Sequence, residues 1–518
     1  MNRAEMLDRI KSRKTPWDFI IIGGGATGVG CCLDAASRGF DVLLLEQSDF
    51  GKGTSSRSTK LVHGGVRYLA QGDLSLVREA LKERGILRKN APHLVKNQSF
   101  IVPCYSIWQK FFYGAGLKTY NLLSGKYGFG KSVILSKNET LRRLPNIKSK
   151  NLRGGILYFD GQFDDARLLI DLLKTAVEQS ATVLNYAPVF ELTKIKNKID
   201  GVKFRDAETG EDFTAKAKVV INATGAFCDT VRRLSNEKAE KIIAPSQGIH
   251  LVFDREFLSS GDALMIPKTS DGRVLFAIPF HGKTLVGTTD TPIETAELEP
   301  RAFEREIKFI LQTAAEYFDK PPQREDVLSI FAGVRPLVKS AKTKNTAALS
   351  RDHTIEIDES DLLTITGGKW TTYRRMAEDA VNQAIERANL SAKNCATEDL
   401  KIHGFCEDAE KFGDLAVYGA DARKIRELIK ESPSLGEKLH ADLPYRAAEV
   451  IWAIRFEMAQ TVEDVLARRT RALFLDAKAA VEMAPRVAEI MALEAGKDAN
   501  WIAGQIEIFN KIAGNYCI

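Results

Sequence analysis

The amino-acid sequence predicts an α/β fold: a domain built on a parallel sheet, interleaved with a mixed-sheet domain and followed by an all-α C-terminal domain. Strand-like and helix-like segments alternate near the N-terminus, and strand-like runs rich in Val, Ile and Phe dominate the middle of the chain. After about residue 390, helix-forming residues dominate. Because 518 residues are too many for one ordinary core, two or three domains are expected.

The segment Asp18–Glu46 has the pattern of a βαβ unit. A buried strand runs into a glycine-rich turn, a helix of small residues follows until Gly39, and Val42–Leu45 forms a second strand. Strand, glycine turn, helix and second strand in this order predict a dinucleotide-binding domain.

The three glycines of Gly23-x-Gly25-x-x-Gly28 each have a mechanical role in such a domain. Gly23 makes the tight turn, Gly25 lets the backbone approach a pyrophosphate, and Gly28 lets the helix pack closely on the sheet. The pyrophosphate then lies at the helix N-terminus. Glu46 follows Gly25 by 21 residues and is placed to accept both ribose hydroxyls. Its charge would repel a 2′-phosphate, so the motif favours FAD or NAD over NADP.

Apolar runs predict the later elements. An apolar face at three- to four-residue spacing predicts a helix over Tyr445–Asp476. Runs rich in Val, Ile and Phe predict strands at Ala187–Leu192, Gly201–Arg205, His250–Phe253, Arg273–Pro279 and Thr284–Gly287.

The overall charge is mildly basic, with a net charge of +6 and a pI of about 8.7. That balance suits an anionic substrate or an anionic membrane face, and it is too modest to indicate a nucleic-acid partner. The seven cysteines form no CxxC, which favours reduced thiols in the cytoplasm. The seven histidines show no HxH or HExxH spacing, so no metal site is expected.

No membrane-spanning or secretory segment is expected. The first sixteen residues are charged and lack the apolar core of a signal peptide. No run reaches the roughly 18 consecutive apolar residues that a spanning helix needs. Attachment to a membrane surface remains compatible with the sequence.

Two further polar segments are candidates for cofactor contact. After Glu46, the hydroxyls of Thr54, Ser55 and Ser56 begin a loop that can wrap a diphosphate or a ring, and His63 lies in the same loop. A buried strand that starts at Lys218 ends in a glycine, Gly225, where a second sheet edge meets the nucleotide.

A third segment begins at Ile365, where a strand, a glycine turn and a helix start follow one another. Its residues Gly368, Lys369 and Thr371 form a second phosphate- or ring-binding helix N-terminus.

The order of these motifs resembles one family closely. GGGxxG, TSS…KL.HGG.RYL, NATG, GTTD, GVRPL and GGK.TTYR follow one another over about residues 17–390, as in bacterial FAD-dependent glycerol-3-phosphate dehydrogenase. The segment VIWAIRFEMAQTVEDVLARRTR is similar to the helical domain of that family. The HGGVRYL and GGKWTTYR blocks are specific, whereas many flavoproteins share the nucleotide fingerprint.

The resemblance implies an FAD-binding Rossmann-like domain of the glutathione-reductase/D-amino-acid-oxidase type with an interleaved substrate domain. The implied reaction is oxidation of sn-glycerol 3-phosphate to dihydroxyacetone phosphate, with hydride transfer from C2 to flavin N5 and electron delivery to membrane quinone. The implied location is the cytoplasm, peripheral on the cytoplasmic face of the inner membrane, and a homodimer is compatible with the sequence. The expected boundaries are a nucleotide domain at about 17–95, 155–245 and 330–390, a substrate domain at about 96–154 and 246–329, and a helical domain at 391–518.

The resemblance also places substrate contacts. Arg67, Tyr68 and Lys369 fall on substrate-binding positions, as do His250 and Arg335. A phosphomonoester dianion is best held by a guanidinium fork plus an ammonium group, which Arg67 and Lys369 supply.

The catalytic assignments follow from the chemistry of these side chains. Arg335 can polarise the C2 oxygen, but a guanidinium is a poor base near neutral pH. We expect His250 to accept the hydroxyl proton, with His63 as the second candidate. For both histidines and for the arginines, an ordinary structural or surface role is the competing interpretation.

Two other segments invite interpretation. Gly125–Ser132 satisfies the P-loop pattern, but it follows a helix-like stretch and precedes a strand, which is the wrong context for a nucleotide-hydrolysis loop. Ile107–Tyr120 mixes aromatic residues with lysines, which predicts either a surface helix in a lipid interface or an aromatic cluster packed on the substrate domain.

Competing functions remain open. A soluble oxidase would run the same half-reaction and return electrons to dioxygen, and a relative acting on an amino acid would need no Lys369. A flavoprotein that binds RNA or a protein is suggested by the basic run at 468–471, although such a run more commonly faces solvent on a helix or caps its end.

Overall fold

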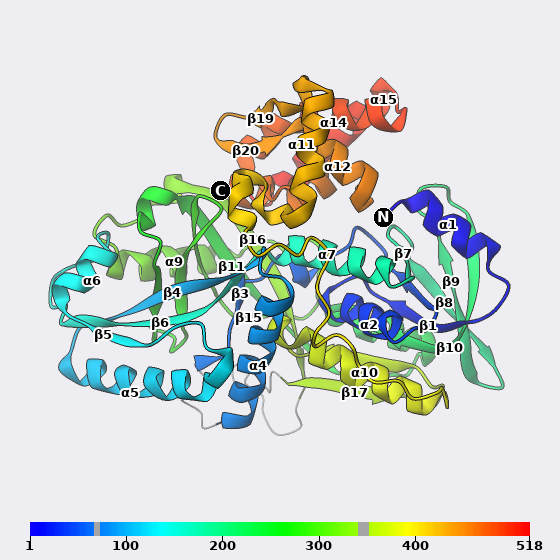
Figure 1. Ribbon diagram of the computed structural model, residues 1–518, viewed down its shortest axis with the longest axis horizontal. Helices are drawn as coiled ribbons and strands as arrows, with labels where there is room; N and C mark the ends of the chain where they lie inside the picture. The colour runs from blue at the N-terminus through cyan, green and yellow to red at the C-terminus, as the bar shows by residue number, and fades with distance from the viewer. Residues whose placement is uncertain (67–72, 340–351) are drawn as a thin grey trace.

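The computed structural model has two large β-sheets with their covering helices, and above them a mainly helical C-terminal region that carries a two-stranded sheet (Figure 1). The structure describes residues 1–66, 73–339 and 352–518. Arg67 and Tyr68, two of the predicted substrate contacts, therefore lie outside the described residues.

The first sheet is parallel at its centre, as predicted for a dinucleotide-binding domain. Its hydrogen-bonded order is β17-β18-β10-β1-β2-β7, and β9 and β8 extend from β10. The four pairings from β18 to β7 are parallel, whereas β17, β9 and β8 are added antiparallel. The strands are β1 (Trp17–Ile22), β2 (Val42–Leu45), β7 (Thr182–Leu184), β8 (Val189–Ile195), β9 (Lys198–Arg205), β10 (Asp212–Asn222), β17 (His353–Ile357) and β18 (Leu363–Gly367).

Helices cover this sheet and bury its apolar strands. α2 (Ala26–Ser37), the first crossover helix, packs against β1, β2, α7 (Asp165–Glu178) and α10 (Tyr373–Arg387). α2 is almost wholly buried because its small residues allow these four neighbouring elements to approach it. The predicted second strand Val42–Leu45 is confirmed, and so is the helix stop, because Gly39 has φ +76°. α1 (Arg3–Ser12) and α8 (Cys228–Ser235) complete this half.

The second sheet is mixed. Its order is β15-β11-β14-β13-β12-β4-β6-β3, with β16 paired to β11 and β5 to β6. Three predicted strands, His250–Phe253, Arg273–Pro279 and Thr284–Gly287, lie in its β11, β13 and β14. The strands are β3 (Leu61–Val62), β4 (Val95–Cys104), β5 (Val133–Leu135), β6 (Gly154–Phe163), β11 (Ile243–Asp254), β12 (Ala263–Ile266), β13 (Leu275–Phe280), β14 (Lys283–Gly287), β15 (Thr291–Pro292) and β16 (Val327–Val338).

The second sheet takes strands from segments that were expected in the nucleotide domain. β6 occupies 154–163 and β16 occupies 327–338, so most of both strands falls inside the expected nucleotide segments 155–245 and 330–390. Buried strands of either sheet consist of the same apolar residues, so composition alone does not tell which sheet a strand joins.

The helices of the second half lie around its sheet. They are α4 (Leu74–Asn90), α5 (Ile107–Ser124), α6 (Lys137–Arg143) and α9 (Glu304–Tyr317). α5 lies at the side of the molecule opposite the C-terminal helices (Figure 1). The segment 125–132 connects α5 to β5, so the P-loop-like motif has the context expected of a chance match.

The C-terminal region is mainly helical and lies above α7 (Figure 1). The single helix predicted over Tyr445–Asp476 is wrong: the helix is interrupted at Met458 and again at Arg471, both in the left-handed backbone region with φ +56° and +71°. The segments before and after Met458 both bury apolar side chains, so the apolar spacing in the sequence continues across the interruption. The elements are α11 (Ala422–Glu431), β19 (Lys438–His440), β20 (Leu443–Arg446), α12 (Ala447–Glu457), α13 (Ala472–Leu475), α14 (Ala477–Ala495) and α15 (Ala499–Ala513).

No helix in the described ranges combines the length and the apolar character needed to cross a membrane. Within the same ranges, no cluster of His, Cys, Asp and Glu side chains has the arrangement of a metal site.

Candidate active site

The turn after β1 has the shape that its glycines predict. Gly23 has φ +112°, and a Cβ there would lie 2.7 Å from the carbonyl oxygen of Ala223. At Gly28 a Cβ would lie 1.9 Å from the carbonyl oxygen of Gly23. A side chain at Gly28 would push α2 away from the turn, and a side chain at Gly23 would clash with the backbone at the end of β10. Both glycines are therefore needed for this turn.

The N-terminus of α2 opens into a cavity. Gly25 is the N-cap residue and makes no side-chain cap hydrogen bond, and the backbone N–H of Ala26 donates to Ser55 Oγ at 2.8 Å. Glu46 accepts hydrogen bonds from the backbone N–H groups of Gly24 at 2.6 Å and Ser48 at 3.0 Å. Burial nevertheless raises the pKa of the Glu46 carboxyl above its usual range.

This glycine-turn cavity has a volume of about 270 Å³, and residues from many parts of the sequence line it. Its walls come from the turn after β1, the end of β2, the 51–55 segment, the end of β10 and the β18–α10 turn. The predicted cofactor residues that line it are Gly23, Gly25, Glu46, Thr54, Ser55, Gly225 and Gly368, together with the predicted substrate residue Lys369.

Three predicted cofactor residues do not line the cavity. Gly28 lies beneath the turn, as described above. The Ser56 side chain is buried, and its carbonyl oxygen accepts from Arg471 Nη2 at 3.0 Å. Thr371 Oγ1 accepts a hydrogen bond from the backbone N–H of His63 at 3.2 Å.

A second cavity, the His63 cavity, has a volume of about 160 Å³ and lies among strands of the second sheet. His63 and Arg335 line it, and so do Thr59 and Asp290. Arg335 and the next residue, Pro336, line different cavities: Pro336 faces the glycine-turn cavity. The two cavities are therefore neighbours across strand β16.

Arg335 is held in place at the His63 cavity. Its Nη2 donates to Thr288 Oγ1 at 3.0 Å and to the carbonyl oxygen of Thr289 at 2.9 Å, and Nη1 lies 3.4 Å from Asp290 Oδ1. Its side chain keeps 22% of its surface exposed. A fixed, partly accessible guanidinium can bind an anion or polarise an oxygen in this cavity.

His250 lies behind the cavity wall and not on it. Its ring is stacked on Phe331, with 4.9 Å between centroids, and its Nε2 lies 2.9 Å from Thr59 Oγ1. Burial, and then the positive charges of Lys60 and Arg335, hold the pKa of His250 well below its usual range. The ring is therefore neutral, and its Nε2 faces Thr59, which lines the cavity.

Sequence reasoning missed two charged residues that line the His63 cavity. Arg273, at the start of the β13 segment, adds a second guanidinium. Asp160 on β6 is buried and accepts from Arg84 Nη1 at 2.6 Å and from the Tyr120 hydroxyl at 2.8 Å. Neither belongs to a recognisable motif, since only the pairing of distant strands brings them to the cavity.

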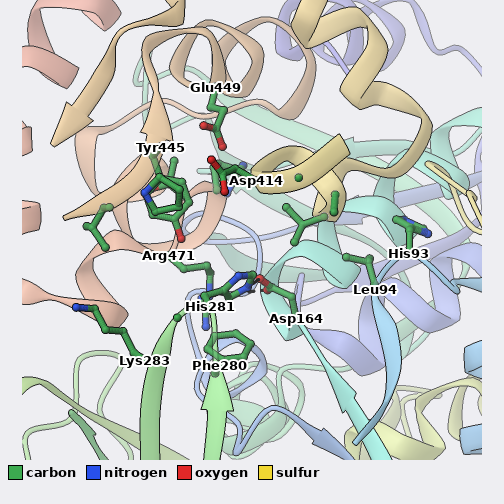
Figure 2. A pocket seen from close by; sticks show the side chains of 18 of the residues that line it. His93, Leu94, Asp164, Phe280, His281, Lys283, Asp414, Tyr445, Glu449 and Arg471 are labelled. Carbon is green, nitrogen blue, oxygen red and sulfur yellow. Dashed lines mark hydrogen bonds and ion pairs between the residues drawn. The ribbon is translucent and has the colours of Figure 1, made fainter. Parts of the chain in front are cut away.

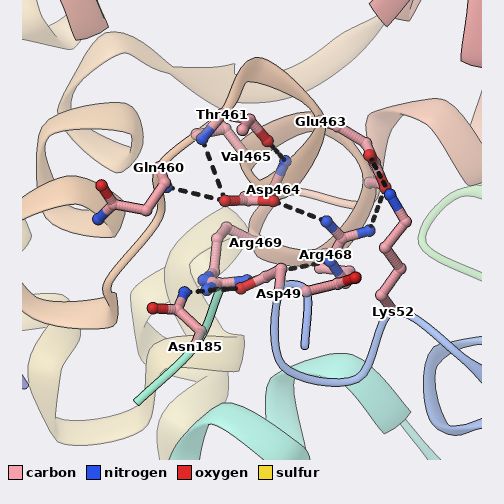
Figure 3. A network of polar contacts seen from close by, with 12 residues as sticks. Asp49, Lys52, Asn185, Gln460, Thr461, Glu463, Asp464, Val465, Arg468 and Arg469 are labelled. Carbon is pink, nitrogen blue, oxygen red and sulfur yellow. Dashed lines mark hydrogen bonds and ion pairs between the residues drawn. The ribbon is translucent and has the colours of Figure 1, made fainter. Parts of the chain in front are cut away.

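The run of basic residues at 468–471 is buried, so the expectation that it faces solvent is wrong. Arg469 donates to both oxygens of Asp49 at 2.8 and 2.9 Å, and Arg468 donates to Glu463 at 2.7 Å and Asp464 at 2.8 Å (Figure 3). This network joins the C-terminal region to the loop that lines the glycine-turn cavity. The partners of these arginines are far away in sequence, so a short window cannot reveal them.

A third and larger opening, the C-terminal cleft of about 560 Å³, lies between the β13–β14 hairpin and the C-terminal region. Figure 2 shows Tyr445 and Glu449 on one side and Phe280 and His281 on the other. None of the predicted site residues in the described ranges lines it. We therefore assign the candidate active site to the two smaller cavities.

Comparison with known proteins identifies the family of this chain. The family described as FAD-dependent oxidoreductase matches residues 18–373, and the C-terminal domain of alpha-glycerophosphate oxidase matches residues 363–501. Glycerol-3-phosphate dehydrogenase, mitochondrial, of Bos taurus is 40% identical over 520 residues, covering 94% of this chain and 71% of that protein. Glycerol-3-phosphate dehydrogenase SDP6, mitochondrial, of Arabidopsis thaliana is also 40% identical, covering 92% of this chain and 83% of its own.

The chain belongs to the FAD-dependent glycerol-3-phosphate dehydrogenase family. This confirms the resemblance seen in the motifs, and the cofactor is FAD. The glycerol-3-phosphate dehydrogenase of Bacillus halodurans, solved in complex with FAD, has a TM-score of 0.81 at 29% identity and covers 99% of this chain and 97% of its own. The L-alpha-glycerophosphate oxidase of Mycoplasma pneumoniae has a TM-score of 0.55 at 16% identity, over 75% of this chain, and shares the fold alone.

Proposed function

We propose that this dehydrogenase-family protein oxidises sn-glycerol 3-phosphate to dihydroxyacetone phosphate in the His63 cavity and passes the electrons to a membrane quinone. The observation that carries the proposal is the adjacency of two cavities across β16, one with the glycine turn and one with His63 and Arg335. The relatives named above are glycerol-3-phosphate dehydrogenases, which supports the choice of substrate.

FAD belongs in the glycine-turn cavity. The N-terminus of α2, which faces this cavity, suits the diphosphate, and the Glu46 carboxylate suits the adenosine ribose. Gly368, Lys369 and Pro336 line the same cavity. When bound, FAD supplies the acceptor for the C2 hydride.

The substrate phosphate is a dianion and needs fixed cations. Arg335 and Arg273 are the guanidinium groups that line the His63 cavity in the described ranges. The family resemblance adds Arg67 and Tyr68 from the same loop as His63, and Lys369 lies on the wall of the adjoining cavity. Bidentate guanidinium contacts fix the orientation of the phosphate as well as its charge.

His63 is the better placed of the two histidines to accept the C2 hydroxyl proton. It lines the cavity, whereas His250 lies behind Thr59. A proton acceptor must come within hydrogen-bond reach of its substrate, so His63 takes this role and His250 supports it through the Thr59 hydroxyl. Arg335 polarises the C2 oxygen as the proton leaves.

In this proposal, α5 is the helix that contacts the membrane, where the quinone is found. Its side chains Trp108, Phe111 and Phe112 are 80%, 66% and 67% exposed, so these rings do not pack on the sheet beneath. Lys110 and Lys118 on the same helix supply positive charge for anionic lipid. We place the protein peripherally on the cytoplasmic face of the inner membrane, bound through this helix.

Product analysis tests the proposed reaction. Protein loaded with FAD is incubated with sn-glycerol 3-phosphate and a water-soluble dye, and dihydroxyacetone phosphate is measured enzymatically, with glycerol as the control that lacks the phosphate. Dye reduction matched by dihydroxyacetone phosphate is expected. Hydrogen peroxide formation in air at the rate of dye reduction would favour the oxidase alternative.

A further inference from the structure

Asp165, the first residue of α7, is a buried carboxylate between two buried cations. Lys60 Nζ donates to its two oxygens at 2.7 and 2.9 Å, and Arg471 Nη2 donates to Oδ1 at 3.1 Å. The Asp165 side chain has no exposed surface, and those of Lys60 and Arg471 have 1% and 2%. A buried carboxylate with two charged donors stays in one orientation, because moving it would leave charges without partners.

The same three side chains fix the chain segment Ser56–Lys60. The backbone N–H and the hydroxyl of Ser58 donate to Asp165 Oδ2 at 3.1 and 2.7 Å. The carbonyl oxygen of Ser56 accepts from Lys60 Nζ at 2.7 Å and from Arg471 Nη2 at 3.0 Å. Lys60 itself has φ +62°, a backbone conformation unfavourable for a residue with a side chain, so these contacts hold a shape that the segment would not keep alone.

This segment leads directly into the candidate active site. Thr59 lines the His63 cavity, and its hydroxyl lies 2.9 Å from His250 Nε2. The Lys60 ammonium lies 5.2 Å from the centroid of the Phe331 ring, and His250 is stacked on that ring. His63 follows Lys60 by three residues in the sequence.

We propose that Asp165 and Arg471 are positioning residues for the oxidation: by holding Ser56–Lys60 they fix Thr59, His250 and the approach of His63 to the substrate. This inference rests on the proposed function. Arg471 belongs to the C-terminal region, so the helical domain contributes to the active site without touching substrate. The matching contacts of Arg469 with Asp49 secure the preceding loop in the same way.

The cluster also sets the electrostatics of His250. Lys60 faces Asp164, Asp165 and Arg471, and burial together with Arg471 lowers the pKa of its ammonium to about 7. Without the Asp165 charge, Lys60 loses its proton more easily. Burial is the main cause of the low pKa of His250, and the charges of Lys60 and Arg335 lower that pKa further, so loss of the Lys60 charge removes one of these contributions. The pKa of His250 should then rise.

The test compares Asp165→Asn with a matched control. Asp421→Asn removes another buried carboxylate that binds α7, where Lys174 Nζ donates to it at 2.6 Å, but Asp421 does not contact Ser56–Lys60. For each FAD-loaded variant, kcat and KM for sn-glycerol 3-phosphate are measured with a dye from pH 5.5 to 9, beside the FAD-to-protein absorbance ratio. Lys60→Met is the second variant, because it removes the cation while leaving Asp165 paired with Arg471.

Asp165→Asn is expected to keep FAD, to lower kcat about ten- to a hundred-fold with a smaller effect on KM, and to lose activity on the acid side at higher pH than the parent. Lys60→Met should move the acid limb in the same direction, whereas Asp421→Asn should leave the limb in place. The inference would be overturned if the dependence of kcat on pH in Asp165→Asn and in Lys60→Met matched that of Asp421→Asn. If Asp165→Asn does not fold, Lys60→Met decides alone. A parent that holds FAD but does not oxidise the substrate would overturn the proposed function and this inference with it.

Discussion

Arg335 and Pro336 are consecutive residues of β16 and line different cavities, Arg335 the His63 cavity and Pro336 the glycine-turn cavity. Neighbours along a strand point to opposite faces, so β16 separates the two cavities and contacts both. The reacting carbon of a substrate held by Arg335 can thus lie near a ring held on the other side of the strand.

Arg335→Ala should lower kcat/KM for sn-glycerol 3-phosphate far more than it lowers FAD content. Removing one partner of a largely desolvated charge pair costs about 2–5 kcal/mol, or roughly 30- to 5000-fold. Steady-state kinetics with a water-soluble dye measure the loss. Arg205→Ala is the matched control, because Arg205 is 55% exposed and pairs with Asp212 on the surface. Equal kinetics for the two variants would remove Arg335 from the substrate site.

Glu46→Gln should weaken FAD binding while leaving kcat of the FAD-saturated protein nearly unchanged. The loss of a charge-assisted hydrogen bond to the ribose costs about 1–3 kcal/mol. Fluorescence titration of apoprotein with FAD measures the affinity, and Glu191→Gln on the exposed face of β8 serves as the control. An unchanged FAD affinity would place the ribose elsewhere.

The membrane prediction concerns the exposed rings of α5. Trp108→Ser, Phe111→Ser and Phe112→Ser together should release the protein from anionic vesicles and leave turnover with a water-soluble dye nearly intact, because these rings are exposed and contribute little to the core. Vesicle binding of the parent should weaken as salt rises. Leu493→Ser with Ile508→Ser is the control, since these side chains are 88% and 55% exposed in the C-terminal region. Release by the control pair, or no vesicle binding by the parent, would contradict the α5 assignment.

The C-terminal region should lose stability as the pH rises past neutrality. Burial alone would lower the pKa of His403, but hydrogen bonds from the ring to Asp421 and Glu178 raise it to about 9. Since the unfolded value is about 6.5, protonated His403 stabilises the fold fully below about pH 6.5, and this contribution is lost as the pH rises through about 9. A shift of this size corresponds to at most about 3 kcal/mol.

His403→Gln measures that contribution. The apparent melting temperature of the variant should fall below that of the parent at pH 6 and approach it at pH 9.5. Asp421→Asn should show the same pH trend, and the double variant should lose less than the sum of the two single losses. A difference from the parent that is the same at both pH values would mean that the charge of His403 contributes nothing.

The local elements of the first sheet could be predicted because their signals are short-range. The turn at Gly23 and the strand Val42–Leu45 follow from residues within thirty positions of one another, and both are confirmed. The position of Arg469 could not be predicted, because its partner Asp49 is 420 residues away. The residues next to a short basic segment do not indicate that distant carboxylates will pair with it in the interior.

The candidate active site was predictable only in part for the same reason. Residues inside motifs, such as Gly25, Glu46 and Arg335, line the cavities. The relation of His250 to Thr59 depends on how β11 lies against the 56–60 segment, which no periodicity in either segment specifies. The role of Asp165 could not be predicted, because its buried partners Lys60 and Arg471 lie 105 and 306 residues away in the sequence.

An anaerobic visible spectrum of the purified protein, recorded before and after addition of sn-glycerol 3-phosphate, tests the reaction most directly. Oxidised flavin should be present at the start and its band should bleach within the turnover time, while glycerol, which lacks the phosphate, should cause no bleaching. Readmitted quinone should restore the band faster than dioxygen does. A flavin band that is present but unchanged by sn-glycerol 3-phosphate would contradict oxidation of this substrate in the His63 cavity.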